Sequence, residues 1–322
     1  MREFILVLTG GVGGAKLCLG LQRVLASDGL QIAVNTGDDF EHLGLRISPD
    51  IDTTVYTLSG MSNAELGWGR AGETWTFMDV LRTLGGATWF RLGDGDLALH
   101  VERTRRLQNG ERLSEITADV AARWGLRTRI FPMSDDAVRT VVSTSDGEME
   151  FQDYFVRHRC EPVISALRFE GAEQAHISPN LYAALLSPEL SGIVIAPSNP
   201  YLSIDPILSL PQMRELVGAR AVPCIAVTPI IGDAAVKGPT AKIMRELGIQ
   251  PSPLGVVEHY GGLIDGFVLD SRDQLLAGKM DLHVEACDTL MSSLEDRERV
   301  ANSALKLLGN IKSARRGNNP GR

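Results

Sequence analysis

The sequence predicts an α/β fold, a Rossmann-like doubly wound and mostly parallel sheet with an inserted subdomain of helices and antiparallel strands. Three observations support this prediction. A glycine-rich turn joins an apolar run to a helical stretch near the N-terminus. Apolar runs alternate with helical stretches after residue 160, which is typical of a parallel sheet covered by helices on both faces. Residues 60–160 do not show this alternation; they combine helical stretches with a stretch that alternates like antiparallel strands.

The strands and helices of the core are predicted in chain order. The apolar run from Phe4 to Leu8 predicts the first strand, and the apolar spacing of the residues after Lys16 predicts a helix. The run from Gln31 to Asn35 predicts a second strand. Further apolar runs bounded by turn residues predict strands at 193–196, 224–227, 266–270 and 282–284.

The middle of the chain predicts the insertion. Residues 65–84 and 113–123 have helical periodicity, whereas 129–154 alternates like antiparallel strands around an Asp-Gly turn at 146–147. We therefore assign 1–59 and 161–310 to a nucleotide-binding core and 60–160 to the inserted subdomain. Residues 311–322 are rich in Gly, Asn and basic side chains and predict a disordered basic tail.

The composition restricts the class of protein. The chain has 322 residues, 44% of them hydrophobic, and a net charge of −8, which argues against a nucleic-acid-binding surface. No apolar run approaches the ~20 residues of a membrane span, and no charged segment with a cleavage site precedes the first strand, so we expect a cytoplasmic protein. The 4 cysteines are far apart and predict free thiols.

The glycine cluster after the first strand predicts a phosphate site. Gly10, Gly11, Gly13 and Gly14 let the backbone approach an anion, and the helix N-terminus behind them supplies free N–H groups. No hydroxyl residue follows Lys16, so the turn is not a P-loop. The dinucleotide-binding pattern Gly-x-Gly-x-x-Gly would begin at Gly11 and end at Lys16. A lysine at this last position suits a charged phosphate. The turn therefore indicates a nucleotide diphosphate, with less weight on NAD.

Aspartates cluster after the second predicted strand. Asp38 and Asp39 follow the strand directly, and Asp50 and Asp52 come within fifteen residues. Carboxylate oxygens near a phosphate are typical magnesium ligands. We predict Asp38, Asp39 and Asp52 as ligands of Mg²⁺, and Asp39 and Asp52 as catalytic candidates. The alternative is that Asp38 and Asp50 cap helices.

Two further regions contain candidate binding residues. The stretch from Trp89 to His100 includes Arg91, Asp94 and His100, where an arginine can hold a phosphate or carboxylate and an aromatic ring can face a planar ligand. The alternative is a turn between two packed elements. Polar, proline-stiffened loops follow the later strands and suit base and ribose recognition; their candidate residues are Ser198, Asn199 and Lys237.

Taken together, these residues resemble the 2-phospho-L-lactate transferase family of coenzyme F420 biosynthesis over about residues 3 to 305. The resemblance rests on many motifs in the same order. These are Gly10 to Lys16, Asn35 to Asp39, Ile47 to Thr53, Gly67 to Gly69, Trp89 to His100, Phe131 to Asp136, Phe151 to Val156, Pro197 to Pro200, Ser203-Ile204 with Pro206 to Leu208, and Lys237 to Lys242.

The resemblance implies a phosphotransferase reaction. A phospho-acid group, which is 2-phospho-L-lactate or an analogue such as phosphoenolpyruvate or 3-phosphoglycerate, moves from an acid–diphospho–guanosine donor to the ribityl hydroxyl of the deazaflavin Fo. GMP is released and Mg²⁺ is required. Asp52 and Arg91 match positions that bind the deazaflavin alcohol, and we add Asp94 and His100 as neighbouring candidates. The resemblance also implies a homodimer.

One position departs from the family pattern. Relatives usually have Gly-Asp-Arg-Asp where this chain has Gly93-Asp94-Gly95-Asp96. The missing arginine removes a cation and is expected to leave space in the acid pocket. We therefore expect a looser pocket that accepts more than one acid.

Two other function classes remain open from the residues. A nucleotide-binding regulator of the gluconeogenesis-factor type has a similar first turn, but it typically has Asp-Asp-Gly-Gly-Ser-Ser after the second strand, whereas this chain has Asp38-Asp39-Phe40-Glu41-His42. An NAD(P) oxidoreductase is disfavoured by Lys16 and by the aspartate cluster.

Overall fold

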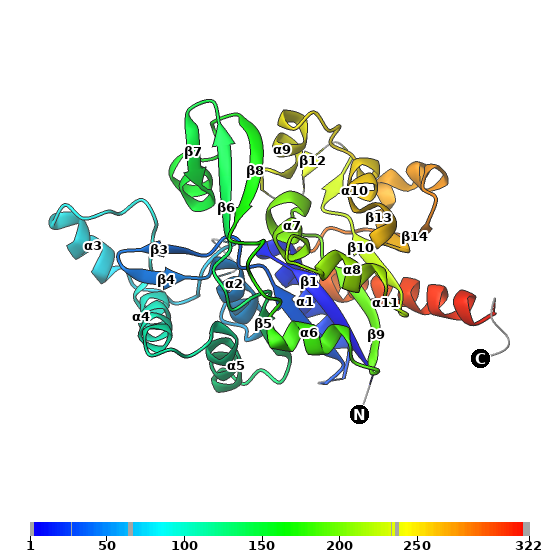
Figure 1. Cartoon of the computed structure of the whole chain (residues 1–322), viewed down its shortest axis with the longest axis horizontal. Helices are drawn as coiled ribbons and strands as arrows, with labels where there is room; N and C mark the ends of the chain where they lie inside the picture. The colour runs from blue at the N-terminus through cyan, green and yellow to red at the C-terminus, as the bar shows by residue number, and fades with distance from the viewer. Residues whose placement is uncertain (1–2, 27, 64–66, 233, 236–237, 318–322) are drawn as a thin grey trace.

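A seven-stranded parallel sheet forms the centre of the molecule (Figure 1). The computed structural model describes residues 3–26, 28–63, 67–232, 234–235 and 238–317. The strand order is β14–β13–β10–β9–β1–β2–β5, and each neighbouring pair is parallel. The strands are β1 (Phe4–Thr9), β2 (Leu30–Val34), β5 (Arg129–Pro132), β9 (Leu190–Ile195), β10 (Cys224–Val227), β13 (Gly266–Asp270) and β14 (His283–Cys287). The predicted fold class is confirmed.

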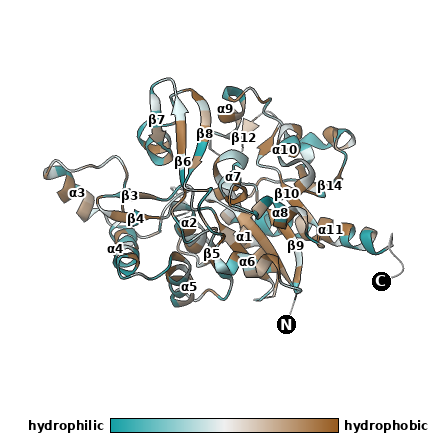
Figure 2. Cartoon of the chain, in the orientation of Figure 1, coloured by the Kyte–Doolittle hydropathy of each residue, from teal (hydrophilic) through white to brown (hydrophobic). Residues whose placement is uncertain are grey.

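Alternating side chains of the strands enter two separate cores. In β1, Leu6 and Leu8 face one core, whereas Ile5 and Val7 face the other. Because successive side chains of a strand point to opposite faces, a strand that is buried on both faces must be apolar throughout. Figure 2 shows the corresponding brown colour on the central strands β9 and β10.

Helices cover both faces of the sheet. One core is completed by α1 (Gly11–Val24), α2 (Pro49–Leu58), α5 (Leu113–Arg123) and α11 (Leu294–Gly317). The other is completed by α6 (Pro179–Leu185), α7 (Asp205–Leu208), α8 (Met213–Gly218), α9 (Thr240–Glu246) and α10 (Pro253–Tyr260). Shorter helical segments are η1 (Asp153–Arg157), η2 (Pro200–Ile204), η3 (Gly261–Leu263) and η4 (Ser271–Lys279).

Two small structures project from this core (Figure 1). The first combines the hairpin β3 (Phe40–His42) and β4 (Leu45–Ile47) with α3 (Thr76–Thr83) and α4 (Asp94–Gln108) around its own apolar cluster. The second is the antiparallel sheet β7–β6–β8, built from β6 (Arg139–Thr144), β7 (Gly147–Glu150) and β8 (Ile164–Glu170). The two-residue strands β11 (Ile230–Ile231) and β12 (Ala234–Ala235) also pair.

The predicted insertion boundaries need correction. The range 60–160 contains β5, which pairs with β2 as the edge strand of the main sheet, so the range is not a separate subdomain. The physical reason is that a four-residue apolar run fits a parallel or an antiparallel ladder equally well, and only tertiary packing selects between them. The predicted helix at 65–84 is shorter in the structure, because α3 begins at Thr76.

The predicted disordered tail also needs correction. The last helix continues to Gly317 because Ile311, only 2% exposed, packs into the core beneath the sheet. Arg315 also donates a hydrogen bond to Asp265. Residues 318–322 of the predicted tail lie outside the described residues. In the part of the chain that the structure describes, no helix is long and apolar enough to cross a membrane.

Candidate functional site

A cavity of about 400 Å³ lies at the carboxyl ends of β1, β2, β9 and β10. This edge of an open α/β sheet is where ligands bind. Most of the predicted site residues line the cavity: Gly10, Gly11, Gly13, Lys16, Asp38, Asp52, Arg91, His100, Ser198 and Asn199. The cavity lining does not include Gly14, Asp39 or Asp94. Lys237 lies outside the described residues.

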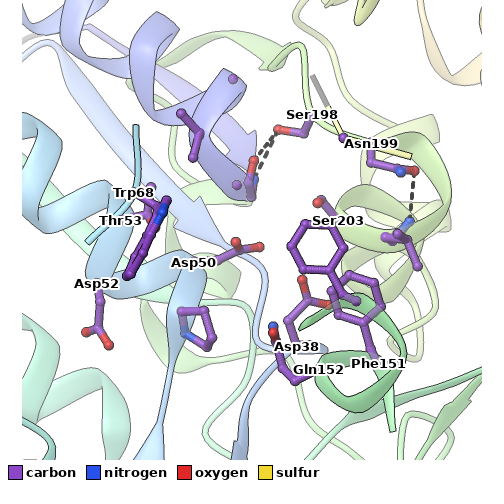
Figure 3. Close-up of a pocket in the computed structure, with 18 of the residues that line it drawn as sticks. Asp38, Asp50, Asp52, Thr53, Trp68, Phe151, Gln152, Ser198, Asn199 and Ser203 are labelled. Atoms are coloured by element: carbon purple, nitrogen blue, oxygen red, sulfur yellow. Dashed lines mark hydrogen bonds between the residues drawn. The ribbon is translucent and has the colours of Figure 1, made fainter. Parts of the chain in front are cut away.

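The turn between β1 and α1 packs against the loop after β9. The Gly10 N–H donates a hydrogen bond to the Ser198 hydroxyl at 3.1 Å, and this hydroxyl donates to the Gly10 carbonyl at 2.7 Å (dashed lines in Figure 3). A Cβ atom at Gly13 would lie 2.7 Å from the Pro197 carbonyl oxygen. Glycine is therefore required there for the loop to approach the turn, while the first N–H groups of α1 keep no helical partner.

Gly14 has a structural role at the same turn. A Cβ atom at this position would overlap the Thr9 hydroxyl and come 2.5 Å from the Ser198 hydroxyl. The residue is buried on the strand side of α1. Its hydrogen side chain therefore allows the helix to pack closely on β1, and the structure gives it no place in the cavity wall.

Two polar residues hold together the side of the cavity next to the glycine turn. The Lys16 ammonium donates a hydrogen bond to the Met291 carbonyl at 2.8 Å, which ties α1 to the segment before α11. The Asn199 carboxamide oxygen accepts hydrogen bonds from the N–H groups of Tyr201 and Leu202 and caps η2. Its Nδ2 atom is buried and has no hydrogen-bond partner among the described residues. Asn199 therefore offers an amide donor at the cavity wall.

Asp38 and Asp50 form a buried acidic pair beside the glycine turn (Figure 3). Asp50 accepts a hydrogen bond from the Asn35 amide at 3.0 Å. Burial raises the pKa of Asp50 to about 6, and burial together with the charge of Asp50 raises the pKa of Asp38 well above its usual value. The Oδ1 atom of Asp38 has no hydrogen-bond partner among the described residues.

Asp50 was not among the predicted site residues. The sequence offers one sign of its position, a proline directly before it at the start of a helix that follows a strand. The first turn of α2 then faces the first turn of α1, and a Cβ atom at Gly10 would overlap the Asp50 carboxylate.

Asp39 points away from the main cavity. Its carboxylate accepts a hydrogen bond from the Ser48 hydroxyl at 2.6 Å, and it lines a separate cavity of about 50 Å³. Burial raises the pKa of Asp39 to about 8. Asp38 lies in a turn that the Asp39 N–H closes with a hydrogen bond to the Thr36 carbonyl at 3.1 Å, and Asp38 and Asp39 line different cavities. The structure therefore does not bring the predicted metal ligands Asp38, Asp39 and Asp52 together.

Asp52 is held by a cation of the protein itself. Both of its carboxylate oxygens accept hydrogen bonds from the guanidinium of Arg103 on α4, and both side chains are buried. His100 lies beside this pair, with its Nδ1 atom 3.8 Å from Asp52. Ligand atoms of Asp52, Asp96 and His100 lie within 4.8 Å of one another. The Arg103 guanidinium neutralises the Asp52 charge and binds both of its carboxylate oxygens, which makes Asp52 a poor ligand for a metal ion.

Asp96, like Asp50, lines the cavity but was not among the predicted site residues. It accepts a hydrogen bond from the Tyr56 hydroxyl at 2.6 Å, and the His100 Nε2 atom lies 3.3 Å away. Burial raises the pKa of Asp96, but the interactions with His100 and Tyr56 outweigh burial and lower it overall. Asp96 therefore keeps its charge at the cavity wall.

The predicted residues Arg91 and Asp94 have different places. Arg91 lines the cavity, and its guanidinium lies over the Trp75 ring at 4.2 Å from the ring centroid. Asp94 instead caps α3: it accepts hydrogen bonds from the Thr74 hydroxyl at 2.5 Å and from the N–H groups of Thr76 and Phe77. The Asp94 carboxylate therefore has a helix-capping role in the structure.

The space expected at Gly95 is absent. The Glu73 carboxylate accepts hydrogen bonds from the Gly95 and Asp96 N–H groups and caps α4. A Cβ atom at Gly95 would lie 2.5 Å from the Arg70 guanidinium and 2.9 Å from the Glu73 carboxylate. Arg70 therefore places a cation beside the position where relatives have arginine, and the ends of the Arg70 and Glu73 side chains take up the space expected there. The looser acid pocket stays a prediction.

Comparisons with known proteins find relatives that match nearly the whole chain. The family model described as 2-phospho-L-lactate transferase CofD matches residues 5–303. The chain is 38% identical over 318 residues to the phosphoenolpyruvate transferase of Streptomyces griseus, covering 96% of this chain and 99% of that protein. It is 38% identical over 300 residues to the 2-phospho-L-lactate transferase of Methanosarcina mazei, covering 92% and 98%.

The fold also resembles a solved structure. A crystal structure of a UPF0052-family protein from Bacillus halodurans superposes with a TM-score of 0.64 at 13% identity. The superposition covers 95% of this chain and 99% of that chain. At this identity the likeness shows a shared fold and nothing about activity.

Proposed function

Because this chain belongs to the 2-phospho-L-lactate transferase family, we propose that it transfers a phospho-acid group from an acid–diphospho–guanosine donor to the terminal ribityl hydroxyl of the deazaflavin Fo, releasing GMP. The observation that carries this proposal is a single continuous cavity. It joins the glycine turn, the acidic pair and a wall of aromatic side chains. Transfer between two large substrates at one phosphorus needs such a shared space.

The donor half of the cavity is the half next to the sheet. The N-terminus of α1 supplies N–H groups and the positive end of a helix dipole, which suits the diphosphate. The loop with Ser198 and the Asn199 amide lies beside this turn, and Thr228 follows β10 at the same edge. These polar groups suit the guanosine.

The reaction is a displacement at phosphorus. The ribityl oxygen forms a bond to the phosphorus that carries the acid, and the bond from this phosphorus to the GMP oxygen breaks with its electron pair leaving on GMP. The proton of the hydroxyl passes to a carboxylate. Asp96 is the candidate because its side chain lines the cavity, whereas Asp39 lines a separate cavity.

A divalent cation is part of the proposal, and Asp38 and Asp50 are the residues that would hold it. Their fit rests on the unpartnered Oδ1 atom of Asp38, on the closeness of the Asp50 carboxylate to the glycine turn, and on the cavity that both residues line. Mg²⁺ prefers carboxylate oxygens and commonly shares its site with substrate phosphates. When bound, the ion would neutralise the negative charge of the diphosphate. Asp52 fits less well because Arg103 holds both of its oxygens.

The transferred acid is one of three candidates. Relatives named after phosphoenolpyruvate and after 2-phospho-L-lactate match this chain at the same 38% identity, so identity does not select between these two acids. Phosphoglycerate is the third candidate. A site distinguishes acids that differ by a hydroxyl mainly through hydrogen bonds to that hydroxyl. Arg70 and Glu73, which precede α3 and contact the first turn of α4, are the charged groups nearest to Gly95.

The test is a direct transfer assay. The purified protein is incubated with Fo, Mg²⁺ and each of the three guanylylated acids, and the products are identified by mass spectrometry. We expect a phospho-acid ester of Fo and GMP with at least one donor, loss of product with EDTA, and recovery with added Mg²⁺. No product from any donor, or tighter binding of NADH than of GDP, would overturn the proposal. GDP binding without transfer would favour a nucleotide-binding regulator.

A further inference from the structure

Three polar side chains of α4 lie on one face of this helix. Asp96, His100 and Arg103 are spaced four and three residues apart, so they follow one another along the helix. The first and the last of them contact α2, because Asp96 accepts a hydrogen bond from Tyr56 and Arg103 binds Asp52. His100 lies between them, is 1% exposed and lines the cavity. The surroundings of its ring are therefore set by the packing of two helices.

The Nδ1 atom of His100 faces a group that can only donate hydrogen bonds. The Arg103 Nη1 atom lies 3.3 Å from it, with the geometry of a hydrogen bond. A guanidinium has N–H groups and no acceptor, and it keeps its charge in proteins. Nδ1 must therefore present its lone pair to Arg103, because a proton on Nδ1 would bring two donors together.

Neighbouring contacts exclude the other arrangement of this pair. Arg103 is held in place by Asp52, which accepts hydrogen bonds from both of its terminal nitrogens. The Asp52 carboxylate lies 3.8 Å from the His100 Nδ1 atom, which is too far to accept a hydrogen bond from it. A proton on Nδ1 would therefore have no acceptor in this pair, whereas a lone pair there has a donor.

The proton of the neutral imidazole then lies on Nε2. This atom is buried and has no aligned hydrogen-bond acceptor among the described residues, but the Asp96 Oδ2 atom lies only 3.3 Å away. The other oxygen of Asp96, Oδ1, accepts the hydrogen bond from the Tyr56 hydroxyl at 2.6 Å. Each Asp96 oxygen therefore has a donor beside it, one from α2 and one from α4, and an N–H attracts the carboxylate charge.

We infer that His100 is a positioning residue: Arg103 fixes its ring as the tautomer with the proton on Nε2, and this N–H orients the Asp96 carboxylate at the cavity wall. In this tautomer His100 directs no lone pair at Asp96 and does not act as a base. The role in the reaction rests on the proposed function, in which Asp96 is the candidate to take the proton of the acceptor hydroxyl. The tautomer itself is independent of that function.

The tautomer is measured on the wild-type protein without substrates. Labelling with nitrogen-15 histidine gives ring signals from the 6 histidines of the chain, and the His100 signal is the one that His100→Gln removes. Nitrogen chemical shifts distinguish a protonated from an unprotonated ring nitrogen. Near neutral pH we expect an unprotonated Nδ1 and a protonated Nε2 in His100. A protonated Nδ1 would overturn the inference whether or not the protein is active.

Matched variants test what the Nε2 proton does in the transfer reaction. A glutamine side chain reaches the position of Nε2 and keeps a donor for Asp96, whereas asparagine reaches only the position of Nδ1. His100→Asn is therefore expected to lower kcat about tenfold or more, the effect of losing a hydrogen bond to a charged group, and His100→Gln is expected to keep most of kcat. KM for the guanosine donor should stay unchanged in both variants.

The control is His176→Gln, because the His176 side chain is 89% exposed and lies outside the cavity lining. Its kcat is expected to equal that of the wild-type protein. Equal losses of kcat in His100→Gln and His100→Asn would show a merely structural role and overturn the positioning role. Normal kcat in His100→Asn would also overturn it and leave the proposed function intact. A wild-type protein without transfer activity would overturn the proposed function and the positioning role together, while the nitrogen signals would still decide the tautomer.

Discussion

Asp52 and Arg103 form a buried ion pair in which both carboxylate oxygens accept hydrogen bonds from one guanidinium. The Asp52 side chain is 8% exposed and the Arg103 side chain 3%. The pair joins α2 to α4 and so connects the sheet core to the projecting structure that carries Arg91. Because Asp52 is buried and paired, its substitution affects stability as well as any contact with substrate.

Asp52→Asn is expected to lower the free energy of unfolding by about 3–5 kcal/mol, because it leaves the Arg103 charge buried without a partner. Urea unfolding measures this loss. Asp79→Asn on exposed α3 is the control and is expected to change stability by less than about 0.5 kcal/mol. A normal unfolding curve for Asp52→Asn with abolished transfer would contradict the pairing and restore the view of Asp52 as a free metal ligand.

Arg91→Lys is expected to raise KM for Fo although it keeps the charge. The flat guanidinium of Arg91 lies on the Trp75 ring, and an ammonium group offers neither this face nor two parallel hydrogen bonds. Steady-state kinetics measure the effect, with Arg82→Lys on the outside of α3 as the matched control. Equal KM values for Arg91→Lys and the wild-type protein would show that only the charge matters.

The stability of the metal-free protein is expected to depend on pH through Asp39. Its pKa is raised from 3.8 to about 8 on folding, so the unfolded state releases this proton at lower pH than the folded state. The stability that the group contributes is complete below about pH 4 and is lost as pH rises toward 8. Asp39→Asn removes this loss. The difference in unfolding free energy between variant and wild type should therefore grow in favour of Asp39→Asn from pH 5 to pH 8, and a constant difference would contradict the shift.

Gly95→Ala is expected to destabilise the protein by at most about 1 kcal/mol, because the added methyl group meets only the ends of the Arg70 and Glu73 side chains, which can move. Thermal unfolding measures the change. Gly218→Ala is the control, since a Cβ atom there has no neighbour within 4 Å. In the Arg70→Ala background the Gly95→Ala effect should shrink. An additive double variant would show that Arg70 does not occupy this space.

The central sheet was predictable because its strands are short apolar runs between helical stretches. The runs at Phe4 to Leu8 and at 224–227 are strands in the structure, and the glycine turn joins β1 to α1. The role of the edge strand β5 was not predictable, because its four residues contain no information about the partner strand. The helical continuation to Gly317 depends on Ile311 reaching a core that is distant in the sequence.

Local sequence therefore determined most elements, the order of the βα units and the position of the glycine-rich turn, since periodicity and turn chemistry act over a few residues. Tertiary structure decided which carboxylates share a site. Asp38 lies beside Asp50 in the main cavity, and Asp39 lines a separate one. It also placed Arg103 on Asp52 and Arg70 beside Gly95. The physical reason is that a charge in a folded protein responds to groups a few ångströms away, and these come from helices and loops that only packing brings together.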